Sequence, residues 1–365
     1  MTLNVETALR HVKPRVRRLG AYTLPPSEPR IKLNQNESPY DVPAELKERI
    51  AQRLANRPWN RYPPFVAANF ISAVAEATGW PEEGILVGNG SNELIQALLA
   101  VTVGPGVTVV IPEPTFTLYR LLTEVNGGSV AAVPLRDDLS FDVEGIVRAA
   151  TGSGAAAIVL CSPNNPTGTA LTRSEIERIH DETDALLLLD QAYVEFGGYD
   201  AIPLLQGRPR VVVLRTFSKA RAMAGLRAGY LLAHAALAAE VSKAKLPYNI
   251  NFFTEIAAAE VFRARALLEP QVEAIRATRD RLSAALGEIS AIRVFPTAAN
   301  FVLFRVERAG ISHTEVFDRL LREHGILVRD VSGYPMLDGC LRVNAGTPEE
   351  TEAFLSALRS ILSRE

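Results

Sequence analysis

The sequence contains few cysteines and no long apolar run. Cys161 and Cys340 are its only cysteines in 365 residues, a density far below that of secreted domains built on disulfides. We therefore expect both to be reduced residues of a cytoplasmic protein. No apolar run approaches the roughly 20 residues of a membrane-spanning helix, and the first twenty residues lack the apolar stretch of a secretory signal. These absences predict a soluble protein with no membrane partner.

An excess of basic charge is also missing. Lysine and arginine total 39 against 41 aspartates and glutamates, which gives a formal net charge of -2. Binding to the phosphate backbone of nucleic acids needs a strong basic excess, so we exclude nucleic acid as the main partner. Hydrophobic residues make up 47% of the chain, which is enough for a substantial core. A chain of this length is expected to form one large and one smaller domain.

Short apolar runs alternate with helical patterns over much of the chain, and this alternation predicts the fold class. The runs cover residues 85–87, 107–111, 130–133, 156–160, 186–189 and 211–214, and the helical stretches between most of them cover 91–102, 115–126, 142–150 and 172–182. Strands that are apolar throughout, interleaved with helices, are typical of a mostly parallel sheet covered on both faces. Residues 252–288 predict one long helix that joins two domains, and the mixed pattern after it predicts a small α+β domain.

Polar residues directly follow four of the apolar runs. These stretches are 88–93, 161–168, 190–193 and 215–219, the last continued by a glycine-containing segment at 224–229. Ligands of open α/β sheets bind outside the carboxyl ends of the strands. We therefore expect the four stretches to converge on one crevice.

Each stretch has a structural and a chemical interpretation. The glycine-rich loop before Ser91 could bind an anion at a helix N-terminus, or Ser91 could simply cap the helix. The prolines around Asn165 could present its amide at a fixed point or form an ordinary turn. Asp190 needs a cationic partner if it is buried, which an arginine could also supply. Lys219, with Arg227 eight residues later, indicates a nucleophile beside an anion site. A ring with a phosphate, a phenolic oxygen, a basic nitrogen and an aldehyde would satisfy all four.

In these residues the sequence resembles the fold-type I pyridoxal-phosphate (PLP) aminotransferases, and most of all their histidinol-phosphate aminotransferase branch. The resemblance runs from about Leu33 to the C-terminus, and its stretches are 33–39, 61–63, 90–94, 162–168, 190–193, 216–227 and 341–343. It implies an aspartate-aminotransferase-like α/β fold, with a mostly parallel seven-stranded sheet between helices in a large domain plus a smaller α+β domain. The implied boundaries are 1–40 for an N-terminal arm packing with the small domain, 41–270 for the large PLP-binding domain and 271–365 for the small domain.

The resemblance assigns the chemistry to three catalytic residues, Lys219, Asp190 and Tyr193. Lys219 would bond covalently to the aldehyde of pyridoxal 5'-phosphate and later shuttle a proton. Asp190 would keep the pyridine nitrogen protonated, so that the ring withdraws electrons. Tyr193 and Asn165 would hydrogen-bond to the phenolic oxygen. No metal site is predicted.

The resemblance also implies how the cofactor is bound. The residues around its phosphate would be Ser91, Asn92, Thr216, Ser218 and Arg227. Phe116 would lie over the ring face, where the family usually has tyrosine. Tyr62 would reach the phosphate of the neighbouring subunit, which requires a homodimer with active sites at the interface. Gln191 stands where the family commonly has glutamate, and strand alternation turns it away from the ring.

Two arginines, Arg329 and Arg342, resemble the family's anion-binding residues, and Tyr22 and Asn36 would complete the substrate pocket. Arginine's planar fork suits both carboxylate and phosphate. Arg329 could instead form a surface pair with Asp330. The implied reaction is PLP-dependent transamination of histidinol phosphate with 2-oxoglutarate, giving imidazole acetol phosphate and glutamate in histidine biosynthesis.

Three other functions remain open at this point. The chain could be an aromatic or broad-range amino-acid aminotransferase, because the motifs specify the cofactor better than the side-chain pocket. It could be a phospho-amino-acid decarboxylase on the same scaffold. A cofactor-binding regulatory protein without catalysis would need a further DNA- or partner-binding module, for which residues 1–30 are too few.

Overall fold

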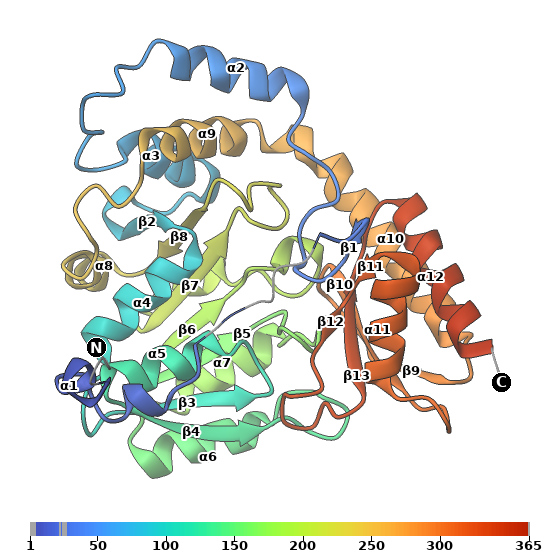
Figure 1. The fold of residues 1–365 in the computed structure, drawn as a ribbon. Coiled ribbons are helices and arrows are strands. Elements are labelled where there is room, and N and C mark those ends of the chain that lie inside the picture. Colours follow the sequence, from blue (N-terminus) through green and yellow to red (C-terminus); the bar gives the residue numbers. More distant parts are fainter. Residues whose placement is uncertain (1–4, 22, 24–27, 364–365) are drawn as a thin grey trace.

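The computed structural model describes residues 5–21, 23 and 28–363, and its larger part is built on a seven-stranded sheet (Figure 1). The strand order is β2-β8-β7-β6-β5-β3-β4. The strands are β2 (Ile85–Asn89), β3 (Thr108–Glu113), β4 (Ser129–Pro134), β5 (Ala157–Cys161), β6 (Leu186–Asp190), β7 (Val211–Thr216) and β8 (Ala228–Leu232). Only β8 runs antiparallel to its neighbours. The prediction of a mostly parallel seven-stranded sheet is confirmed.

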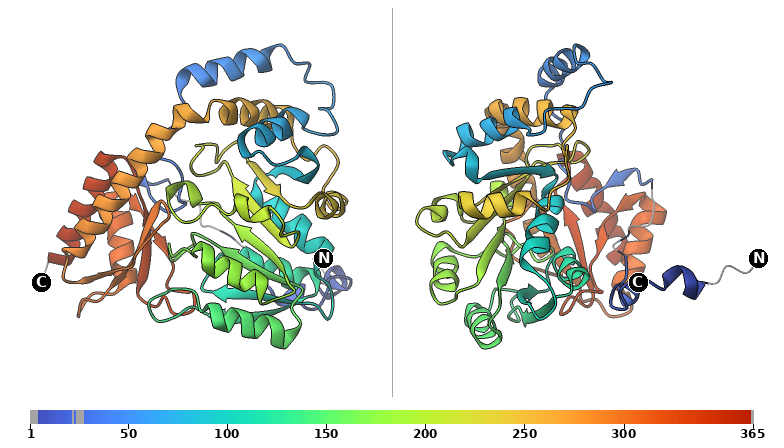
Figure 2. Two further views of the ribbon diagram at one scale, coloured as in Figure 1. Left: turned by 180° about the vertical axis from the view of Figure 1, so that it is seen from behind. Right: turned by 90° about the vertical axis from the view of Figure 1, so that its left-hand side faces the viewer.

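Helices cover both faces of this sheet (Figure 2). Alternate residues of the central strands enter separate cores, with Leu187 and Leu189 on one face and Leu188 on the other. The first core contains residues of α2 (Ala44–Ala55), α3 (Ala68–Thr78), α6 (Val143–Ser153), α7 (Arg173–Asp181) and α9 (Phe252–Arg263). The second contains residues of α4 (Ser91–Thr102), α5 (Leu118–Asn126) and α8 (Ala235–Ser242). Burial on both faces explains why the central strands are apolar throughout.

The C-terminal part is a four-stranded antiparallel sheet packed against helices. Its strand order is β12-β13-β10-β9. The elements are α10 (Glu269–Gly287), β9 (Ile292–Val294), β10 (Phe301–Val306), α11 (His313–His324), β12 (Arg329–Asp330), β13 (Cys340–Asn344) and α12 (Pro348–Ser363). Near the N-terminus, β1 (Ile31–Lys32) pairs in parallel with β11 (Ile326–Leu327). This pairing ties the segment before α2 to the C-terminal part, whereas α1 (Val5–Leu9) protrudes from the body (Figure 2).

The prediction of one continuous helix over 252–288 is wrong. Helix α9 ends at Arg263, a 3-10 turn spans Arg265–Leu268, and α10 begins at Glu269. Pro270 lies in the first turn of α10, where its missing N–H costs nothing, but it would remove a hydrogen bond inside a continuous helix. The break lets α9 pack on the large sheet while α10 runs toward the small one (Figure 1).

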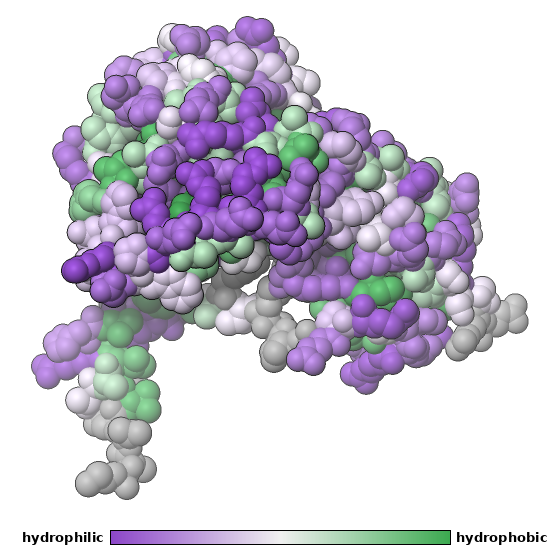
Figure 3. All heavy atoms as spheres, turned by 90° about the horizontal axis from the view of Figure 1, so that it is seen from above, coloured by the Kyte–Doolittle hydropathy of each residue, from purple (hydrophilic) through white to green (hydrophobic). Residues whose placement is uncertain are grey.

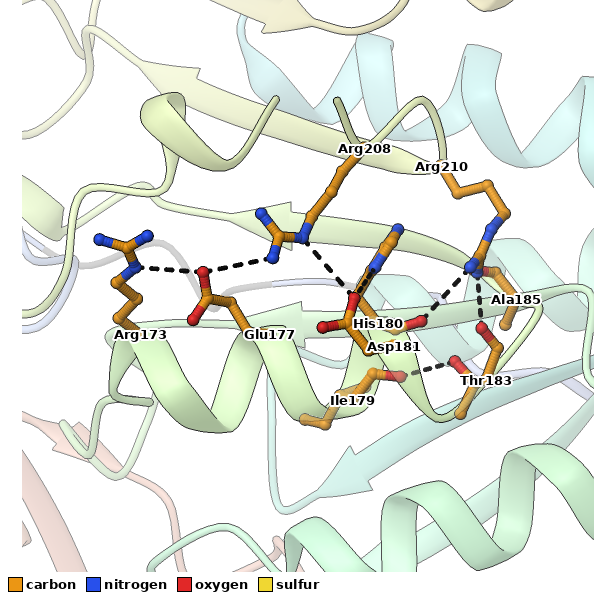
Figure 4. Close-up of polar contacts among 9 residues, drawn as sticks. All are labelled: Arg173, Glu177, Ile179, His180, Asp181, Thr183, Ala185, Arg208 and Arg210. Carbon is orange, nitrogen blue, oxygen red and sulfur yellow. Dashed lines mark hydrogen bonds and ion pairs between the residues drawn. The ribbon is translucent and has the colours of Figure 1, made fainter. Parts of the chain in front are cut away.

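Hydrogen bonds and ion pairs of nearby side chains stabilise the region around the amino ends of β6 and β7 (Figure 4). Arg210 donates from Nη1 to the carbonyl oxygens of Thr183 and Ala185, at 2.6 and 3.1 Å. Asp181 accepts from His180 Nδ1 at 2.7 Å and lies 3.7 Å from Arg208 Nε. These side chains therefore bond to neighbouring parts of the protein, whereas the opposite edge carries the polar residues singled out in the sequence.

The surface over α2 is largely hydrophilic, with scattered apolar residues (Figure 3). Among the described residues, none of the helices combines the length and apolar character that crossing a membrane requires. Within the same ranges, no three His, Cys, Asp or Glu side chains are grouped as a metal site would need.

Candidate active site

A cavity of about 390 Å³ lies at the carboxyl ends of the large-sheet strands, where the N-terminal segment and the small sheet meet them. All four polar stretches predicted to converge contribute to its wall. Of the predicted site residues, it is lined by Asn36, Ser91, Asn92, Phe116, Asn165, Asp190, Tyr193, Thr216, Ser218, Lys219, Arg227, Arg329 and Arg342. Tyr62 lies elsewhere, and Tyr22 lies outside the described residues.

Lys219 follows β7 and reaches across the cavity to the N-terminal segment. Its Nζ donates to the carbonyl oxygen of Gln35 at 2.7 Å. Loss of solvation, together with the positive charge of Arg342, lowers the pKa of Lys219 to about 7. A substantial fraction of this amine is therefore neutral near pH 7, as a nucleophile or general base requires.

Asp190 ends β6 and is buried. Burial raises the pKa of its carboxyl to about 6, although two hydrogen bonds favour the ionised form. The Tyr119 hydroxyl donates to Oδ2 at 2.7 Å, and the Ala192 N–H donates to Oδ1 at 3.1 Å. The carboxyl is therefore oriented before any ligand arrives.

Gln191 points away from the cavity, as strand alternation predicts. Its Nε2 donates to the Tyr199 carbonyl oxygen at 2.7 Å. Its Oε1 accepts from the Ala201 N–H and from Arg215, both at 3.1 Å. Gln191 therefore anchors the following loop from outside the cavity.

Amide and phenol groups line the side of the cavity nearest the small sheet. Asn36 donates from Nδ2 to the Tyr193 hydroxyl at 3.0 Å. Arg342 of β13 donates from Nη1 to Asn165 Oδ1 and from Nη2 to the Asn34 carbonyl oxygen, the latter at 2.7 Å. One arginine thus connects three segments that are distant in sequence.

The opposite end of the cavity is suited to an anion. Arg227 donates to Ser218 Oγ at 3.0 Å, and Thr216 donates to the same oxygen at 3.1 Å. Helix α4 begins there at Ser91, and its first N–H groups attract negative charge. A Cβ built on Gly229 would lie 2.5 Å from the Ser91 nitrogen. Only glycine permits this close approach of the two backbones.

Phe116 and Arg329 border both this cavity and a second one of about 420 Å³. The Phe116 ring meets the Tyr119 ring edge to face, with centroids 5.6 Å apart. Among the ion pairs of the described residues, none joins Arg329 to Asp330, the alternative that the sequence left open.

A profile of the family described as aminotransferase class I and II matches residues 28–358. The chain belongs to this family. It is 42% identical over 335 residues to histidinol-phosphate aminotransferase of Chlorobaculum tepidum, covering 92% of this chain and 95% of that protein. The corresponding protein of Chlorobium luteolum is 40% identical, with 97% and 98% covered. A solved histidinol-phosphate aminotransferase from Sinorhizobium meliloti, in complex with pyridoxal-5'-phosphate, has a TM-score of 0.86 at 24% identity and coverages of 96% and 98%. That likeness supports the fold.

Two contributors to this aminotransferase site were not predicted from the sequence. Tyr119 contacts the carboxylate of Asp190, and Gln35 offers a main-chain carbonyl to Lys219. Tyr119 follows Phe116 by three residues within the stretch 115–126 that was predicted to be helical, a spacing that would place both on one side of such a helix. That spacing was the available signal for Tyr119. A backbone carbonyl leaves no residue-specific signal.

Proposed function

We propose that this aminotransferase uses pyridoxal 5'-phosphate to transfer the amino group of histidinol phosphate to 2-oxoglutarate. The observation that carries the proposal is one cavity that holds the Lys219 amine, the buried Asp190 carboxyl and a glycine-lined anion end. The choice of substrate is supported by the names of relatives about 40% identical over nearly the whole chain.

The residues fit the cofactor at each of its functional groups. The backbones at Gly229 and Ser91 approach too closely for any side chain between them, so no side chain at position 229 displaces the start of α4, whose first N–H groups would bind the phosphate. Arg227 and Ser218 lie beside that helix start. When bound, pyridoxal phosphate supplies an aldehyde for the amino group and a protonated ring that withdraws electrons.

The protein's own groups then carry out proton transfer and orientation. Lys219, whose pKa is about 7, would hold the cofactor through its amine and, when that amine is free, would accept and return a proton. Asp190 would keep the ring nitrogen protonated by accepting a hydrogen bond from its N–H, since the carboxyl is oriented by two donors. Tyr193 and Asn165 take the phenolic oxygen. Phe116 covers the ring face.

The substrate anions meet the arginines of the small sheet. Arg342 is fixed by Asn165 and the Asn34 carbonyl, and Arg329 stands where the two cavities adjoin. We assign to this pair the carboxylate of glutamate and the phosphate of histidinol phosphate. Asn36 completes the pocket through its bond to Tyr193.

A homodimer is part of the proposal. Tyr62 is 82% exposed, and its ring stacks on that of Tyr248 at 4.7 Å. Trp59 is 73% exposed, and Phe65, which is also exposed, packs against the ring of Tyr248. Exposed aromatic clusters mark interaction surfaces. A second copy seated there would cover them and bring Tyr62 to the neighbouring active site.

We also propose the division into an arm at 1–40, a large domain at 41–270 and a small domain at 271–365. The parallel pairing of β1 with β11 supports an arm that packs with the small domain. Free thiols at Cys161 and Cys340, both buried, suit a reducing cytoplasm.

The test compares substrates with the purified, cofactor-loaded protein. Histidinol phosphate with 2-oxoglutarate should be consumed far faster than phenylalanine with the same acceptor, and Lys219→Ala should reduce turnover by orders of magnitude. Faster reaction of phenylalanine would indicate a broad-range aminotransferase with the same chemistry. Release of carbon dioxide from phosphothreonine without amino transfer would indicate the decarboxylase instead.

A further inference from the structure

Tyr119 links two features of the site that lie on different elements. It stands in the first turn of α5 and is completely buried. Its hydroxyl reaches Asp190 Oδ2 at 2.7 Å, and its ring lies edge to face against Phe116, with an interplanar angle of 88°. A tyrosine in the core normally needs one partner for its hydroxyl. Here that partner is the carboxyl that faces the cavity.

Both oxygens of the Asp190 carboxyl have a donor. Oδ2 accepts from Tyr119, and Oδ1 accepts from the Ala192 N–H at 3.1 Å. Each oxygen keeps a further lone pair for a group in the cavity. Removing the tyrosine hydroxyl would leave one oxygen of a buried carboxylate without its donor, which disfavours the ionised form.

None of the other titratable side chains described around Asp190 donates a hydrogen bond to its carboxylate. Cys161, at the end of β5, lies opposite Asp190 in the sheet, and Tyr193 follows three residues later. Burial raises the pKa of the Cys161 thiol and of the Tyr193 phenol far above neutrality, so both stay neutral. Lys219, Arg227 and Arg342 line the same cavity, and no hydrogen bond among the described residues joins any of them to Asp190.

We propose that Tyr119 is a positioning residue, whose hydroxyl, together with the Ala192 N–H, holds Asp190 ionised and directed into the cavity. The inference rests on the proposed function, because Asp190 acts there on the ring nitrogen of the cofactor. Tyr119 itself touches no reacting atom.

The test uses the cofactor-free protein, whose thermal stability is followed from pH 3.5 to pH 8. The folded carboxyl of Asp190 has a pKa of about 6 against 3.8 when unperturbed. Its contribution to stability is therefore complete below pH 3.8 and is lost as the pH rises through 6. In Tyr119→Phe this loss should extend to a pH about one unit higher, because a hydrogen bond to a charged group is worth about that shift. Asp190→Asn should abolish the loss, alone and with Tyr119→Phe.

Tyr230→Phe is the matched control. Tyr230 is also buried, and burial raises its pKa to about 12, but no hydrogen bond among the described residues joins it to a carboxylate. In that variant the stability loss should end at the same pH as in the wild type. Fluorotyrosine at position 119 is a stronger hydrogen-bond donor, so the stability loss should end at a lower pH than in the wild type. This variant tests the proposal even if Tyr119→Phe fails to fold.

A second readout follows the cofactor. Tyr119→Phe should weaken binding of pyridoxal phosphate about tenfold and shift the pH at which the bound cofactor changes its visible absorption. The proposal would be overturned if Tyr119→Phe lowered stability equally at every pH and left two pH values unchanged. These are the pH at which the stability loss ends and the pH at which the bound cofactor changes its absorption. Tyr119 would then be a packing residue only. If the proposed function is wrong, the wild-type protein will not turn over histidinol phosphate. The pH titration of the cofactor-free protein needs no substrate, so its outcome is independent of that result.

Discussion

Replacing Lys219 by methionine should stabilise the cofactor-free protein, and by more at pH 6 than at pH 9. The pKa of this amine is about 7 in the folded protein against 10.5 for an ordinary lysine. The free energy of unfolding is therefore not reduced by Lys219 above pH 10.5, where the amine is neutral in both the folded and the unfolded chain. This stability is lost as the pH falls through 7, because the amine must then be charged inside the folded protein. Methionine has a similar length and carries no charge, so its stability lacks this dependence.

The magnitude follows from the pKa difference. Each pKa unit corresponds to about 1.4 kcal/mol, so the wild type should gain roughly 2.5 kcal/mol on the variant between pH 6 and pH 9. This value is an upper bound, since Lys219 is only partly buried as a residue and water relaxes around it. A gain of this size is large beside a typical free energy of unfolding.

Urea unfolding of both proteins at pH 6, 7, 8 and 9 measures the effect. Lys243→Met is the control, because the Lys243 side chain is 67% exposed and pairs with Glu240 on the surface. Its difference from wild type should not change with pH over that range. A constant difference for Lys219→Met as well would refute the reasoning, because the amine would then be fully solvated in the folded protein.

Three further predictions concern the cofactor, the substrate and the second subunit. Gly229→Ala should weaken cofactor binding about tenfold, because its Cβ would press on Ser91, whereas Gly152→Ala in α6 meets open space away from the cavity and should bind normally in equilibrium titrations. Arg342→Ala should raise the KM for 2-oxoglutarate by about 100-fold in steady-state assays, as loss of a charge-assisted pair predicts; an unchanged KM would contradict its role. Trp59→Ser should shift the protein toward monomer in sedimentation, and an unaltered mass would argue against that surface.

The large sheet was predictable because burial on both faces leaves a direct mark on the sequence. The runs ending at Leu160, Leu189 and Leu214 are apolar in every position, and each is a central strand. Strand β8 was not predicted, because Gly229 lies in it and its start overlaps the expected anion loop. Its neighbour Arg227 has a positive φ of 56°, a local conformation that no periodicity indicates.

The candidate site was predictable where chemistry follows a strand and less so where it depends on packing between distant segments. Asp190 and Lys219 end or follow apolar runs, so their convergence could be inferred. The bond from Arg342 to Asn165 joins residues 177 positions apart, and Gln35 acts through its backbone. The bond from Tyr119 to Asp190 joins residues 71 positions apart. These contacts depend on how the small sheet and α5 pack on the large one.

The covalent role of Lys219 can be tested most directly by chemical trapping. The cofactor-loaded protein is reduced with borohydride, digested and mapped by mass spectrometry. The peptide that contains Lys219 should carry the reduced pyridoxyl phosphate group, and it should be absent from the same map of Lys219→Met. A label on another lysine, or a loaded protein with no labelled peptide, would contradict the assignment of this amine as the attachment point.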